Sequence, residues 1–261
     1  MTVLRSLAFN VAFYANTVLW LFALIPLLVL PRKIFLRAVQ AWGSVSIWLM
    51  RVLAGIRLEF RGLEKIPSGG LLVASKHQSA AETFSLLTLF DDPTFVLKRE
   101  LQWIPLFGWY TMKAAQVPVN RSAGSAALAD MNERARKEAA RGRQIIIFPE
   151  GTRRAPGAPP AYKYGIAHLY QNLGVPCLPV AMNTGVFWPR RSFMRRPGTM
   201  VIEVLDPIPP GLPRDAFFEE VKAAIEAGCD RLLAEARRDL GEAGASGLET
   251  VEPAPRRAGR A

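Results

Sequence analysis

Residues 71–90 read LLVASKHQSAAETFSLLTLF, and this stretch decides the fold class. Its first four residues are an apolar run that ends at Ser75, as expected of a strand buried on both faces. Residues 80–89 then carry apolar side chains at helical spacing, directly after Ser79, a residue type that favours a helix N-terminus. A short buried strand followed by a helix is the repeating unit of an α/β fold.

The same alternation of strands and helices continues along residues 57–240. Gly142 and Gly174 lie where two of the helices should end. We therefore predict an α/β fold with a central, mostly parallel or mixed sheet flanked by helices. The predicted strands cover residues 71–75, 94–98, 116–119, 144–148, 177–182 and 200–205. The predicted helices cover residues 80–89, 125–140, 162–173 and 216–240.

The chain has 261 residues, half of them hydrophobic, which is enough for one domain with a substantial core plus an appendage. This composition excludes a disordered chain, a collagen-like chain and a small disulfide scaffold. Cys177 and Cys229 are the only cysteines, and their sparseness fits a reducing compartment. No group of His, Cys and acidic residues has the spacing of a metal site, so no metal is expected.

Residues 7–30 are almost entirely apolar, interrupted only by Asn10, Asn16 and Thr17. As a helix, these 24 residues would be about 36 Å long, which exceeds a hydrocarbon core of about 30 Å. The bulky residues before Pro31 offer no small-residue cleavage site, which favours an uncleaved membrane anchor over a secretory signal peptide. A buried core helix is the third interpretation.

Residues 34–56 form a second segment, whose polar side chains fall on one narrow stripe of a helix: Arg37, Gln40, Ser44 and Arg51. Such a helix suits the membrane interface, although a helix packed on the following domain would show the same pattern. The sequence thus predicts three regions: a two-helix membrane anchor over residues 1–56, a catalytic domain over 57–240 and a disordered tail over 241–261.

The net charge is +11, and six basic residues but no acidic residue precede Glu59. Because this basic region is also the most apolar one, we expect contact with membrane lipids and not with nucleic acid. Basic residues that follow the first apolar segment favour the cytoplasmic side, so we expect the catalytic domain on the cytoplasmic face of the inner (plasma) membrane. Residues 188–196 hold four arginines among Trp, Phe and Met and are expected to meet anionic headgroups; a solvated loop or nucleic-acid contact are the alternatives.

His77 and Glu82 are the main candidates for chemistry, because His77 follows a predicted strand, where α/β proteins place reactive groups. Within one helix, a separation of five residues would turn the two side chains about 140° apart. They can meet only if the helix begins between them, and Ser79 is a suitable N-cap. His77 would then be a general base oriented by Glu82. Equally, Ser79 and Glu82 form the pattern of a capping box, in which Glu82 would only cap the helix.

Three further segments follow or form predicted strands. Residues 148–154 read FPEGTRR, and a flexible Gly151 followed by two arginines suits the binding of a phosphate. An ordinary turn after a strand, with both arginines in solvent, is the alternative interpretation. Arg121 follows another strand, where a surface arginine is the alternative. Residues 175–180 read VPCLPV, a core or edge strand. No GxSxG nucleophile elbow is present, so a His77 base would act on a hydroxyl of the substrate itself.

In this order, four segments resemble the conserved blocks of the 1-acyl-sn-glycerol-3-phosphate acyltransferase family of glycerolipid acyltransferases. They are residues 77–82, 116–121, 148–154 and 175–180. The stretch that begins Lys98-Arg99-Glu100-Leu101 is also similar to the family's sequence between the first two blocks. The resemblance spans roughly residues 57–210 and is specific, because FPEGTR occurs together with the His–carboxylate block.

Two residues depart from the family pattern. Glu82 stands where Asp is usual, which keeps the carboxylate and adds one methylene, so we expect it to orient His77 in the same way. Lys76 stands where Asn is common and adds a positive charge beside the base, which could help to hold phosphate.

The resemblance implies the glycerolipid acyltransferase fold and a defined reaction. A fatty acyl group would move from a thioester, acyl-CoA or acyl-carrier protein, to the sn-2 hydroxyl of lysophosphatidic acid, giving phosphatidic acid without a cofactor. His77 would be the base and Glu82 its orienting partner. The residues implied for the acceptor phosphate are Arg121, Gly151, Thr152 and Arg153, with Glu150 shaping the pocket and Lys76 and Lys98 as additional candidates.

Other functions remain compatible with these residues. The same chemistry would serve another acceptor, such as a lyso-ornithine lipid, glycerol-3-phosphate or a lysophospholipid. A membrane lipid-binding protein without turnover would also need an anchor and a capped helix. In the enzyme, the acyl chain is expected along an apolar channel near the anchor and residues 175–180, and His168 is expected on a helix surface.

Overall fold

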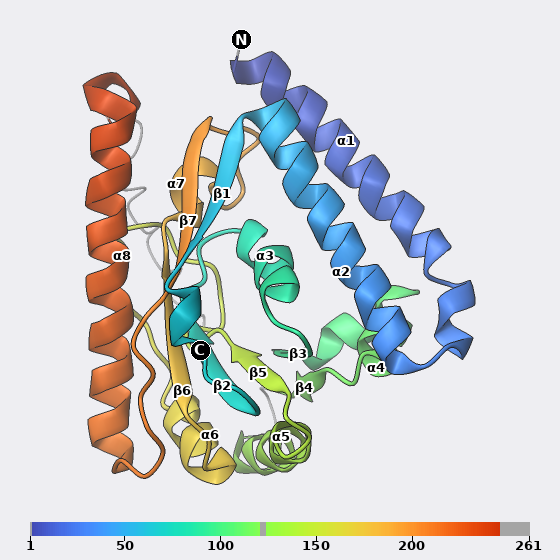
Figure 1. The fold of residues 1–261 in the computed structure, drawn as a ribbon, viewed down its shortest axis with the longest axis vertical. Helices are drawn as coiled ribbons and strands as arrows, with labels where there is room; N and C mark the ends of the chain where they lie inside the picture. The colour runs from blue at the N-terminus through green and yellow to red at the C-terminus, as the bar shows by residue number, and fades with distance from the viewer. Residues whose placement is uncertain (1, 121–123, 246–261) are drawn as a thin grey trace, which may run out of the picture.

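In the computed structural model, which describes residues 2–120 and 124–245, seven strands form one sheet in the order β1-β7-β6-β2-β5-β3-β4 (Figure 1). Within it β6 and β7 are antiparallel, whereas the other neighbouring strands run parallel. The predicted α/β fold with a mixed sheet is therefore confirmed. The strands are β1 (Ile56–Arg61), β2 (Leu71–Ser75), β3 (Pro93–Lys98), β4 (Val117–Val119), β5 (Gln144–Ile147), β6 (Cys177–Met182) and β7 (Gly198–Val204).

Helices cover both faces of this sheet (Figure 1). Two of them, α1 and α2, precede its first strand in the chain. The α-helices are α1 (Thr2–Ala23), α2 (Arg32–Leu49), α3 (Ala81–Leu89), α4 (Phe107–Lys113), α5 (Gly124–Ala139), α6 (Gly165–Leu173), α7 (Thr184–Phe187) and α8 (Arg214–Ala245). Short helical turns are η1 (Pro26–Val29), η2 (Met50–Ala54), η3 (Leu63–Lys65) and η4 (Arg99–Trp103). Helix α8 is interrupted at Gly241, where the predicted tail begins, and residues 246–261 of that tail lie outside the described residues.

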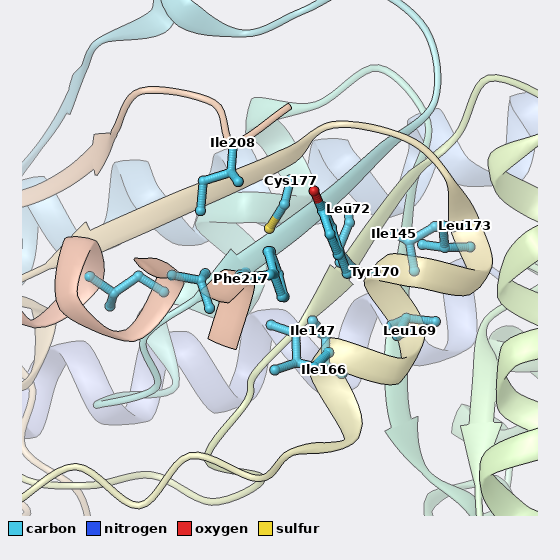
Figure 2. Packing of buried hydrophobic residues seen from close by; sticks show 14 of the residues in the cluster. Leu72, Ile145, Ile147, Ile166, Leu169, Tyr170, Leu173, Cys177, Ile208 and Phe217 are labelled. Atoms are coloured by element: carbon cyan, nitrogen blue, oxygen red, sulfur yellow. The ribbon is translucent and has the colours of Figure 1, made fainter. Parts of the chain in front are cut away.

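One face of the sheet is covered by α5, α6 and α8. Figure 2 shows side chains of the sheet meeting those of α6 and α8. The rings of Tyr170 of α6 and Phe217 of α8 are stacked, with their centroids 3.7 Å apart. Leu72 and Ile145 from the central strands β2 and β5 pack in the same cluster. Every residue of β2 is buried, as its uninterrupted apolar sequence predicts.

The opposite face is covered by α3, and the hairpin of α1 and α2 packs outside α3 (Figure 1). Helices α2 and α3 approach closely at Gly43, where an added Cβ atom would lie 2.9 Å from Cγ2 of Thr88 and 3.2 Å from the carbonyl oxygen of Phe84. The second N-terminal segment therefore rests on the globular domain, which was one of the two interpretations of its polar stripe.

The strand β1 was not predicted: residues 34–56 were assigned to one helix, and no strand was assigned before residue 71. In the structure α2 ends at Leu49, and η2 leads to Gly55, whose positive φ of 71° turns the chain into β1. Strand β1 is an edge strand paired with β7, and its charged residues weaken the apolar signal on which the prediction depended. The short helices α4 and α7 were also missed.

Helix α1 is shifted relative to the predicted helix over residues 7–30. It ends at Ala23 because Pro26, which has no N–H to donate, begins the separate turn η1. Among the described residues, α1 is the one helix that is long and apolar enough to cross a membrane. Polar side chains nevertheless attach it to the domain: Ser6 Oγ accepts the N–H of Arg195 at 2.9 Å, and Asn10 Nδ2 donates to the carbonyl of Phe193 at 2.9 Å.

The close approach at Gly43 generates the first prediction. The Gly43→Val variant should lower the free energy of unfolding by about 1–3 kcal/mol, because its side chain must displace Thr88 or the backbone of α3. Ser44→Val places the same side chain at the exposed neighbouring position and is the control. Thermal unfolding in detergent measures both; equal melting temperatures for the two variants would show that α2 and α3 are not packed this closely.

Candidate active site

The centre of the site is a hydrogen bond between His77 and Glu82. His77 lies in the loop after β2, and its Nδ1 is 2.8 Å from Oε1 of Glu82 in the first turn of α3. The two side chains meet because the helix begins between them. Since Nδ1 donates to the carboxylate, Nε2 is the ring nitrogen left for a substrate. The His77 side chain is 15% exposed, whereas that of Glu82 is completely buried.

The Glu82 carboxylate also caps α3. Its Oε1 accepts the backbone N–H groups of Gln78 at 2.8 Å and Ser79 at 2.6 Å, and its Oε2 accepts the hydroxyl of Thr184 at 2.9 Å. Ser79 Oγ in turn accepts the N–H of Ala81 at 3.2 Å. The Glu82 half of the capping box and the His–carboxylate pair, two alternatives from the sequence, are therefore present together and share one oxygen atom. The expectation that Ser79 is the N-cap was wrong, because the N-cap of α3 is Ala80, without a side-chain cap bond.

The turn over residues 148–154 packs directly on His77. The ring of Phe148 stacks on the imidazole with centroids 4.0 Å apart, and the N–H of Arg154 donates to the carbonyl of His77 at 2.8 Å. These contacts arise because β2 and β5 are parallel neighbours, with Ala74 opposite Ile147, so that the chain leaves both strands at the same edge. Gly151 has a positive φ of 67°, which the tight turn requires.

The other predicted site residues differ in whether they line the cavity of His77, are exposed to solvent or are buried. Gly151, Arg153 and Lys98 line the same cavity as His77. Thr152 is exposed, whereas Glu150 is buried and forms an ion pair with Lys76, which is itself buried. Arg121 lies outside the described residues. His168 is half-buried in α6 beside Tyr164, and it does not line the cavity.

The cavity has a volume of about 780 Å³ and a mainly apolar wall. His77, Lys98 and Arg153 are among its polar lining residues, and Phe148, which stacks on His77, lines it too. Its apolar wall comes from elements far apart in the chain, including Phe35, Val39 and Trp42 of α2 and Phe107 and Tyr110 of α4. Such a shape accommodates a long apolar group whose polar end lies beside the imidazole.

The chain is similar to known acyltransferases. The model of the family named Acyltransferase matches residues 57–183. The 1-acyl-sn-glycerol-3-phosphate acyltransferase of Pseudomonas aeruginosa is 37% identical over 205 residues, which cover 77% of this chain and 79% of that protein. The chain belongs to the 1-acyl-sn-glycerol-3-phosphate acyltransferase family. It is an acyltransferase.

More distant members agree with this assignment. The 1-acyl-sn-glycerol-3-phosphate acyltransferase of Limnanthes alba is 31% identical over 64% of this chain and 58% of its own length. The crystal structure of the 1-acyl-sn-glycerophosphate (LPA) acyltransferase PlsC from Thermotoga maritima has the same fold, with a TM-score of 0.76 over 91% of this chain and 99% of that chain at 24% identity.

Two residues of the candidate site were missed in the sequence. Thr184, the hydroxyl partner of Glu82, follows β6, and Gln78 accepts the N–H of Gly185 at 3.0 Å through its side-chain oxygen. Thr184 belongs to a short polar stretch after a buried strand, which is the same signal that identified His77. The signal could have been applied to β6 as well.

The shared carboxylate generates the second prediction. Glu82→Gln should keep most of the capping bonds but lower the turnover number by about 100-fold or more, because a neutral amide cannot stabilise the protonated imidazole. Turnover and melting temperature are measured together. Thr184→Val removes a bond to the other carboxylate oxygen and, as a control, should lose less than about tenfold. Wild-type turnover in Glu82→Gln would leave Glu82 with a capping role alone.

Proposed function

We propose that this acyltransferase moves a fatty acyl group from an acyl thioester to the sn-2 hydroxyl of 1-acyl-sn-glycerol-3-phosphate, giving phosphatidic acid. The observation that carries the proposal is the His77–Glu82 pair, whose imidazole lines a large, mainly apolar cavity that Arg153 also lines. The names of the relatives support this acceptor for the family.

In the proposed reaction, Nε2 of His77 takes the proton of the sn-2 hydroxyl while its oxygen attacks the thioester carbonyl. The carbon–sulfur bond then breaks, and the thiolate leaves and takes up the proton from the imidazolium. Glu82 holds the imidazole through Nδ1 and stabilises its positive charge. The thioester is already activated, so the reaction needs no metal or other cofactor; acyl-CoA and acyl-carrier protein would both serve as donors.

The acceptor phosphate is proposed to bind at the turn over residues 148–154. Gly151 and Arg153 line the cavity, and the carbonyl of Arg153 accepts a hydrogen bond from Arg190 Nη1 at 2.8 Å, which brings the basic loop of residues 188–196 to the turn. A guanidinium suits phosphate because its N–H groups match two oxygens at once. Arg121 and Thr152 complete the proposed set, and Lys98, on the cavity wall, is a further candidate.

Membrane association is proposed from the surface of the N-terminal hairpin. Large apolar side chains of α1 are exposed at helical spacing, among them Leu4, Leu7, Val11, Val18 and Phe22. A second exposed apolar group lies in the segment of η4 and α4: Leu101, Trp103, Ile104, Phe107, Trp109 and Met112. A surface of this kind is suited to the apolar part of a lipid layer.

The contacts of α1 favour burial in one leaflet over a crossing of the bilayer. Near its N-terminus α1 is bonded to the loop of residues 193–195, and near its C-terminus the hydroxyl of Tyr110 donates to the carbonyl of Leu21. Because both ends rest on the same domain, the helix could not cross the bilayer without that domain. We therefore propose that residues 1–56 are a monotopic anchor on the cytoplasmic face of the inner membrane, joined to the catalytic domain.

The acceptor and donor are tested with purified wild-type protein and a panel of acceptors. Lysophosphatidic acid should give phosphatidic acid with acyl-CoA or acyl-carrier protein, and it should be preferred to lyso-ornithine lipid, glycerol-3-phosphate and lysophosphatidylcholine. Arg153→Leu should raise the KM for lysophosphatidic acid at least about tenfold, with a smaller change in kcat, because it removes binding energy that does not change during proton transfer. No phosphatidic acid from either donor would contradict the proposal, and would favour a lipid-binding protein or another acceptor.

The anchor is tested by co-sedimentation with phosphatidylglycerol vesicles. Val11→Glu together with Val18→Glu places two charges on the exposed face of α1 and should reduce the bound fraction at least about tenfold. Ala234→Glu adds a charge to an exposed position of α8, across the sheet from the hairpin, and should bind like wild type (Figure 1). Equal binding of all three proteins would rule out α1 as the membrane surface.

A further inference from the structure

Lys76 precedes His77 in the chain but belongs to a different environment. Its side chain is 3% exposed, and it does not line the cavity that His77 lines. The ammonium lies 3.2 Å from Oε1 of Glu150 and 2.6 Å from Oε1 of Glu226. A buried ammonium between two carboxylates has its charge neutralised and its donors engaged, which argues against a second task as a phosphate ligand.

The two carboxylates that contact Lys76 come from segments far apart in the chain. Glu150 is in the turn proposed to bind the acceptor phosphate, directly before Gly151. Glu226 is in α8, beyond the end of the family-model match at residue 183. Tyr162 donates its hydroxyl to Oε1 of Glu226 at 2.8 Å, and Lys76 Nζ lies 5.4 Å from the centroid of its ring. Burial, followed by the charge of Glu226, raises the pKa of Tyr162 far above its usual value, so the phenol stays a neutral donor.

Among the described residues, Lys76 is the cation nearest to the Glu150 carboxylate, at 3.2 Å, since Nε of Arg154 is 3.6 Å away. The same Glu150 oxygen accepts the N–H of Ala161 at 3.3 Å. The position of the turn therefore depends on an ion pair whose other member is covalently joined to His77. Loss of the ammonium would leave two carboxylates close together in a buried site, and their repulsion would displace the turn.

We propose that Lys76 and Glu226 are positioning residues for acceptor binding: the ammonium of Lys76, held by Glu226 of α8, fixes Glu150 and with it Gly151 and Arg153 relative to His77. The inference rests on the proposed function. It assigns α8 a role in the site although that helix contributes nothing to the cavity wall among the described residues. Its effect belongs to the affinity for the phosphorylated acceptor, not to proton transfer, because the hydrogen bonds of both side chains go to Glu150, Tyr162 and each other and not to the imidazole of His77.

The test compares Lys76→Met with the double variant Lys76→Met/Glu226→Gln. The single variant leaves the buried Glu150 and the half-buried Glu226 without the ammonium between them, with Arg154 Nε 3.6 Å from Glu150, and should have a lower melting temperature. The double variant removes one of the two charges while keeping an acceptor for Tyr162, so the melting temperature should recover towards that of wild type. Its KM for lysophosphatidic acid should nevertheless remain at least about tenfold above wild type, with kcat changed by less than about threefold, because Glu150 still lacks its ammonium.

The KM for the acyl donor separates positioning from a general loss of structure. It should stay at the wild-type value in the double variant, since a fraction of unfolded protein lowers the maximal rate without changing either KM. Lys137→Met, an exposed lysine paired with Glu133 on α5, is the matched control and should leave all parameters unchanged. An active wild type with an unchanged acceptor KM in the double variant would overturn the positioning role alone. A wild type that does not acylate this acceptor would overturn the proposed function as well.

Discussion

The buried carboxylate of Glu82 is the group on which the rest of the site depends. It has no exposed surface, so it must be satisfied by donors within the protein, and it accepts from His77, from the backbone of Gln78 and Ser79, and from Thr184. Those donors belong to the loop after β2, the start of α3 and the chain after β6. One charged group therefore fixes where the helix begins, which way the imidazole points and how the loop lies over the sheet.

The parallel pairing of β2 and β5 brings the turn over residues 148–154 to the His77–Glu82 pair. Strands β2 and β5 are neighbours in register, so the loop at His77 and the turn after Phe148 leave the sheet side by side. Phe148 stacks on the imidazole, and Lys76 joins the two segments through Glu150. The helices outside the sheet complete the arrangement from both faces: α8 supplies Glu226 on one side, and α2 supplies apolar cavity wall on the other.

Most strands of the sheet could be predicted from the sequence, because central strands and the helices beside them have strong local patterns. All residues of β2 are buried, and six of the seven strands of the described sheet were expected. The errors have two causes. Strand β1 alternates apolar and charged residues, which is the pattern of a half-buried strand, whereas the prediction depended on uninterrupted apolar runs. Pro26 divides an apolar run that otherwise has the length of one membrane-crossing helix.

The sequence by itself determined the fold class, the family and the two residues that form the candidate pair, since these depend on periodicity and on residue types at fixed spacing. It also placed an apolar, basic segment before the domain. Only the tertiary structure decided that Glu82 both caps α3 and binds His77, and that Lys76 turns away from the cavity toward Glu150 and Glu226. The physical reason is that a side chain in a loop points where its partners are, and Glu226, 150 residues further along the chain than Lys76, is brought to it only by the packing of α8 on the sheet.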